Sequence, residues 1–105
     1  MENTFPSGVV FSIFSWENTM PTISRFYAIV IRMYFNEHPP PHFHALYNRY
    51  EALINIKELR IEQGSLPKRA LTLTLEWAEL HQDELFENWE LACQNKPLNP
   101  IKPLE

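Results

Sequence analysis

Hydrophobic and polar residues alternate along the chain between residues 23 and 62, a pattern typical of strands with one buried face. In the stretch Ile23–Phe35 the odd-numbered positions are mostly apolar, whereas the even-numbered positions are mixed. This pattern predicts one long strand there, with its odd-numbered residues toward the core. The next alternating runs predict a second strand at about His42–Tyr47 and a third at Tyr50–Ile56.

The connections between these strands are short. Asn48-Arg49 is suited to a tight turn between the second and third strands, and a short fourth strand is expected near Glu58–Glu62, ending at Gly64. Because hairpin-sized connections join neighbouring strands in opposite directions, the sequence predicts a three- to four-stranded antiparallel meander.

After Gly64 the spacing of the apolar residues changes to that of a helix. Ser65 is a suitable N-cap, and Pro67 then falls in the first turn, where proline is tolerated. The pattern continues to Cys93 and predicts one amphipathic helix of roughly seven turns, bent near His81. Its apolar stripe comprises Leu71, Leu75, Ala78, Leu85, Trp89 and Ala92. Carboxylates occupy the opposite side.

These elements together predict an α+β fold, with the antiparallel meander packed against one long C-terminal helix. We expect residues 20–105 to form this single domain. Residues 1–19 include an apolar run that is too short to span a bilayer and has no basic residue before it. We interpret them as an N-terminal extension outside the domain and expect no membrane association.

Composition narrows the function classes. The net charge is −4 and the acidic residues concentrate after residue 70, which argues against non-specific binding to phosphate backbones. With two glycines, the chain holds no glycine-rich nucleotide-binding motif. The single cysteine, Cys93, has no partner for an internal disulfide and suits the reducing cytoplasm. We expect Cys93 to be buried at the end of the helix.

Candidate chemistry is concentrated in the segment Glu37-His38-Pro39-Pro40-Pro41-His42-Phe43-His44-Ala45, which holds three of the four histidines. Consecutive prolines hold a chain extended, so the imidazoles are presented in a defined way. Since side chains alternate along a strand, His42 and His44 should share the sheet face away from the helix. Arg32, Tyr34 and Glu51 should share that face, forming a surface group with His38 at the start of the strand.

Three interpretations of this group remain open. His42 and His44, with His38 or Glu51 as a further ligand, would suit zinc or another transition metal and leave an open coordination position. Alternatively, His42 and His44 would act as acid and base on RNA, with Arg32 holding a phosphate. In the third interpretation the imidazoles hydrogen-bond the backbone of the proline-rich turn or contact a partner. His81 is expected at the edge of the core rather than as a fourth ligand.

A second apolar strip runs along the flank of the predicted helix and consists of Leu73, Trp77 and Leu80. If the sheet leaves it uncovered, this strip would expose aromatic surface of the kind found at protein interfaces. The sequence therefore predicts that these three residues bind a partner.

Three segments resemble a known bacterial family, the domain of unknown function 4160. They are Met20-Pro21-Thr22-Ile23-Ser24-Arg25-Phe26-Tyr27, the motif over residues 38–45, and Glu76-Trp77-Ala78-Glu79-Leu80-His81. The resemblance covers about residues 20–104 and implies no established catalytic residues. Genes of this family often lie beside a second small family of unknown function, 2442, in pairs reminiscent of toxin–antitoxin modules.

The resemblance implies a small bacterial cytoplasmic protein that acts as an interaction module, with a small protein partner or as a homodimer. One alternative is a small histidine- or metal-dependent hydrolase of the ribonuclease type. Another is a transition-metal-binding module without catalysis. The sequence does not decide whether the chain is an enzyme, nor whether it holds a zinc ion or another transition metal.

Overall fold

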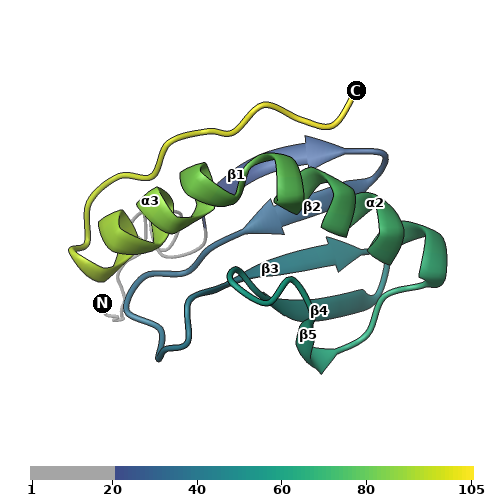
Figure 1. Cartoon of the computed structure of the whole chain (residues 1–105), viewed down its shortest axis with the longest axis horizontal. Helices are drawn as coiled ribbons and strands as arrows, with labels where there is room; N and C mark the ends of the chain where they lie inside the picture. Colours follow the sequence, from purple (N-terminus) through teal and green to yellow (C-terminus); the bar gives the residue numbers. More distant parts are fainter. Residues whose placement is uncertain (1–20) are drawn as a thin grey trace, which may run out of the picture.

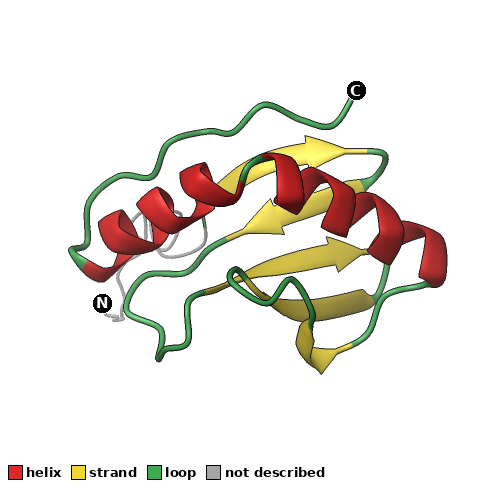
Figure 2. Ribbon diagram, in the orientation of Figure 1, coloured by secondary structure: helices red, strands yellow, loops and turns green. Residues whose placement is uncertain are grey.

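The computed structural model describes residues 21–105 and shows two layers, a sheet and a pair of helices (Figure 1). The interpretation of residues 1–19 as an extension therefore falls outside the described residues. The sheet is antiparallel, and its strands follow chain order: β1 (Thr22–Phe26), β2 (Ile29–Arg32), β3 (His42–Tyr47), β4 (Tyr50–Asn55) and β5 (Ile61–Gly64). The helices α2 (Lys68–Leu80) and α3 (Gln82–Cys93) cross one face of it (Figure 2). The α+β prediction is confirmed, but with five strands and two helices.

The extra strand arises because the stretch predicted as one long strand is a hairpin. Tyr27 and Ala28 form the turn between β1 and β2, with φ angles of 50° and 65°. Two successive positive φ values give the tight hairpin turn that Asn-Gly usually supplies. A Tyr-Ala pair carries no such signal, so the apolar alternation continues across the turn and predicts one strand.

The predicted single helix ends and restarts at His81, the position where a bend was expected. Pro67 occupies the N-cap position of α2, so Ser65 is not the cap. On the predicted stripe Ala78, Leu85, Trp89 and Ala92 are buried, whereas Leu71 and Leu75 are only half-buried. Cys93 is exposed, contrary to expectation, because the last turn of α3 extends past the sheet.

The core lies between the helices and one face of the sheet. Phe43 is paired with Ile54, and Ala45 lies between Ile31 and Ala52 on the neighbouring strands; all five are fully buried. The alternate positions point to the opposite side of the sheet, which we call the outer face. Across β2 to β5 this outer face carries one row of register partners, Arg32, His44, Leu53 and Gln63.

The C-terminal segment, residues 96–105, runs beside the helices toward the β1 edge of the sheet (Figure 1). Ile101 N–H donates to the Ile23 carbonyl at 2.8 Å. The Asn88 side chain binds Asn99 twice, because its amide donates to the carbonyl at 2.8 Å and its oxygen accepts from the backbone N–H at 2.9 Å. The segment is therefore part of the packed domain.

This segment also covers part of the helix flank formed by Leu73, Trp77 and Leu80, where the sequence predicts an interface. Trp77 is fully buried, its indole N–H donates to the Lys102 carbonyl at 2.9 Å, and its ring packs on Phe26. Leu73 is half-buried and Leu80 is 67% exposed. The expected exposed strip is thus absent at Trp77, because the tail and the sheet enclose that side chain. Within residues 21–105, neither helix is long and apolar enough to cross a membrane.

Candidate metal centre

The pleat of β3 places two histidines on the outer face. His42 and His44 alternate with the core residues Phe43 and Ala45, so both imidazoles point away from the core, as the period of two predicts. The expectation of a surface group is wrong, however, because His42 and His44 are only 6% and 4% exposed.

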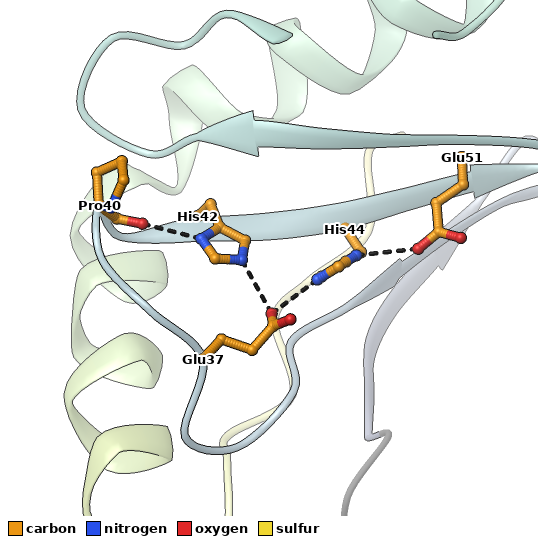
Figure 3. Close-up of polar contacts among 5 residues, drawn as sticks. All are labelled: Glu37, Pro40, His42, His44 and Glu51. Atoms are coloured by element: carbon orange, nitrogen blue, oxygen red, sulfur yellow. Dashed lines mark hydrogen bonds and ion pairs between the residues drawn. The ribbon is translucent and has the colours of Figure 1, made fainter. Parts of the chain in front are cut away.

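The loop of residues 33–41 covers His42 and His44. It turns back at Asn36, which has a φ of 61°, and Glu37 then approaches both imidazoles from below β3 (Figure 3). Two contacts fix this loop: the Asn36 side-chain amide donates to Asn95 Oδ1 at 3.0 Å, and Ile56 N–H donates to the Pro41 carbonyl at 3.0 Å. Glu37 is therefore held against the strand from both ends of the loop.

A single oxygen, Glu37 Oε1, lies 2.9 Å from His42 Nε2 and 2.7 Å from His44 Nε2. The other nitrogen of each ring faces a different acceptor. His42 Nδ1–H donates to the Pro40 carbonyl at 2.8 Å, and His44 Nδ1 lies 2.9 Å from Glu51 Oε2 (Figure 3). Both rings are thus oriented from outside through Nδ1, and both Nε2 atoms converge on one point.

The partners of both rings are all oxygen acceptors. With both glutamates ionised, all four ring nitrogens face oxygens that only accept. A divalent metal ion held by the two Nε2 atoms would carry a charge equal and opposite to that of the Glu37 and Glu51 carboxylates together.

Aromatic side chains fix the planes of both rings. The Tyr34 ring lies 4.2 Å from that of His44, and the Trp89 ring of α3 lies 5.1 Å from that of His42, measured between centroids. These contacts restrict the rotation of each imidazole, as close packing of aromatic rings does.

The site opens into a pocket of about 460 Å³. Glu37, His42 and His44 line it together with the exposed part of the proline-rich loop and residues of β4 and β5. The other lining residues are His38, Pro39, Pro40, Leu53, Glu62 and Gln63. Within the described part of the chain, the only group of three or more His, Cys, Asp or Glu side chains suited to a metal ion is Glu37, His42 and His44, with ligand atoms within 4.8 Å of one another.

The other candidates from the sequence lie around this group in different roles. His38 lines the pocket but is exposed and is not one of the three converging side chains. Glu51 binds the far side of His44, where it orients the ring. Arg32 is the register partner of His44, yet its Nε donates to Thr22 Oγ1 at 3.4 Å. His81 contacts Glu84 and the Trp77 ring, at the core edge as expected.

Sequence reasoning missed Glu37 as a ligand candidate. Its position five residues before His42 gives no periodic signal, because the proline-rich loop between them belongs to neither a helix nor a strand. Only its place in the same short motif as His42 and His44 indicates that Glu37 belongs to the site.

Comparison with known proteins gives one result. No curated protein and no solved structure matches the chain. One family, described as "Domain of unknown function (DUF4160)", matches residues 28–90, more than half of the sequence. The matched range contains every residue of the candidate centre, from Tyr34 to Trp89. The chain therefore belongs to the DUF4160 family, as the three sequence segments indicated.

Proposed function

We propose that this protein binds one divalent transition-metal ion through Glu37, His42 and His44 and uses it as a hydrolytic centre. The observation that carries the proposal is the convergence of both Nε2 atoms on one carboxylate oxygen while both Nδ1 atoms are occupied elsewhere. Metal-bound histidines characteristically donate their second N–H to a backbone carbonyl or a carboxylate. Here Pro40 and Glu51 supply one acceptor of each kind.

The donor set fits a catalytic rather than a purely structural ion. Two imidazoles and one carboxylate are the ligands of hydrolytic zinc sites and of mononuclear iron(II) sites, and both keep positions open for water and substrate. Ligand atoms around a tetrahedral zinc ion are about 3.3 Å apart, given metal–ligand distances near 2.0–2.1 Å. The spacings of 2.7 and 2.9 Å therefore require a shift of about half an ångström, which the Glu37 side chain can make.

The same geometry argues against acid–base catalysis by the histidines alone. A general base needs a nitrogen within hydrogen-bond reach of the substrate. Both Nε2 atoms are engaged with Glu37 and both Nδ1 atoms face other acceptors, so neither ring offers a free nitrogen to the pocket. A metal ion would instead deliver an activated water molecule into the pocket beside it.

Metal counting tests the proposal. We expect native mass spectrometry of chelator-treated protein to show one zinc ion per chain after reloading, and none in His42→Ala or His44→Ala. His38→Ala and His81→Ala are the matched controls and should keep the ion. Affinity should fall as the pH is lowered, because protons compete with the metal for imidazole nitrogen.

Hydrolysis of 4-nitrophenyl acetate by the zinc-loaded protein, above the rate of the metal-free protein and lost in His44→Ala, would support the catalytic part. Zinc bound equally well by the wild type and His42→Ala would overturn the site, as would the absence of stoichiometric zinc, iron or nickel.

A further inference from the structure

The pocket beside the candidate centre continues along the outer face. A second hollow of about 300 Å³ is lined by Glu51, Leu53, Gln63 and Gly64. It shares Leu53 and Gln63 with the larger pocket, so the two form one depression across β3, β4 and β5. We call this depression the outer groove. It is the surface that a substrate at the candidate centre would occupy.

The outer groove is acidic. Three carboxylates line it, those of Glu37, Glu51 and Glu62, and among the described residues that line it there is no lysine or arginine. A divalent ion would be balanced by Glu37 and Glu51, which leaves the charge of Glu62 unmatched inside the groove. Arg60 lies 3.8 Å from Glu62 but is 67% exposed, so solvent weakens this pairing.

Glu62 is held in place by a buried neighbour. Asn55 Nδ2 donates to Glu62 Oε2 at 2.9 Å, and Asn55 itself is fixed because its Oδ1 accepts from Glu58 N–H at 2.7 Å. Asn55 is the register partner of His42. Glu62 therefore lies two strands from His42, about 10 Å away given the usual strand spacing.

From this arrangement we infer that the groove selects a neutral or positively charged substrate, with Glu62 binding its cationic group. The inference rests on the proposed metal centre and adds the substrate class. The substrate would span the distance between the ion and Glu62, as an amide or ester bearing an amino group does. A phosphodiester would meet three carboxylates and no lining cation, so RNA is not the substrate that this groove fits.

Metal-binding probes of one length and three charges test the inference. Cobalt(II) replaces zinc as a coloured reporter, and its content in each variant is counted by mass spectrometry. The probes are β-alanine hydroxamate with a terminal ammonium, neutral butyrohydroxamate, and succinic monohydroxamate with a terminal carboxylate. Their dissociation constants are read from the change in the cobalt absorption bands of the full-length protein.

We expect the cationic probe to bind about three-fold tighter than the neutral one, as one part-exposed ion pair allows, and the anionic probe to bind weakest. Glu62→Gln keeps an acceptor for Asn55 and loses the charge, so the preference should disappear. Glu58→Gln, on the connection that precedes β5 and outside the groove, should retain it.

Different results would overturn the metal centre and the substrate class. Cobalt that binds one per chain, with the anionic probe equal to or tighter than the cationic one, overturns the substrate class and leaves the metal centre intact. A preference that survives in Glu62→Gln also overturns it. Absence of stoichiometric cobalt overturns the metal centre, and the inference with it.

Discussion

Glu37 is the central residue of the candidate metal centre, because its Oε1 faces two imidazoles that are each oriented by another acceptor. The sequence predicted the pairing of His42 and His44, since alternation along a strand is a local property. The partners Glu37 and Trp89 come from a loop and a helix that only tertiary packing brings to β3. Local patterns could not indicate them.

Glu51, the carboxylate that faces His44 Nδ1, gives a prediction for a single residue. Glu51→Gln replaces the carboxylate that accepts from Nδ1–H with a weaker, neutral acceptor. We expect metal affinity to fall about ten-fold, the lower end of the effect of outer-shell partners on bound metals. Competition with a chromophoric chelator measures the change.

Glu87→Gln provides the matched control, because Glu87 is exposed on α3 and lines neither part of the groove. Equal affinities in the Glu51 variant and the wild type would show that Glu51 does not orient His44.

At the scale of elements, predictability depended on the turns. The hairpin β3–β4 was predicted because Asn48 is a residue that tolerates the positive φ of 54° it adopts. The hairpin β1–β2 was missed because Tyr27 and Ala28 are ordinary strand or helix residues. The helix break was anticipated at His81, yet the buried face of α2 is rotated toward Thr74 and Trp77 because the tail packs there.

The junction after β5 lies against Glu51, a residue of the candidate site. Gly64 has a φ of 81°, and a Cβ at this position would overlap the carbonyl oxygen of Glu51, which also accepts from Ser65 N–H at 3.1 Å. Only glycine combines this conformation with so close an approach.

Gly64→Ala should therefore destabilise the fold by about 2 kcal/mol or more, since it adds left-handed strain to a steric clash with backbone. Urea unfolding followed by circular dichroism measures the loss, with Ser65→Ala on the same exposed connection as the control. A change below about 0.5 kcal/mol, the usual range of surface substitutions, would mean that β4 and β5 separate readily here.

For the whole molecule, the family resemblance still predicts a protein partner and a toxin–antitoxin-like pairing. Trp77 cannot anchor such a partner while the C-terminal segment covers it, so the partner-binding role of Leu73, Trp77 and Leu80 loses its aromatic member. The proposed metal centre makes a more direct prediction, because a ligand that binds only the folded state stabilises it.

Metal at 100 times its dissociation constant should add about 2.7 kcal/mol of stability. For a domain of this size that raises Tm by about 10 °C. Thermal unfolding with zinc and with chelator should show this difference in the wild type and none in His42→Ala or His44→Ala. An equal rise in both variants would mean that zinc stabilises the protein at some other place.

The hydrogen bond from Ile101 to Ile23 joins residues at opposite ends of the described chain. During synthesis the β1 edge and the indole of Trp77 stay uncovered until residues 99–102 have left the ribosomal exit tunnel. The histidines and Glu37 emerge much earlier, but Trp89 and Asn95, which fix the His42 ring and the Glu37 loop, follow only shortly before that segment. We therefore expect the proposed metal site to close late in synthesis, together with the hydrophobic core.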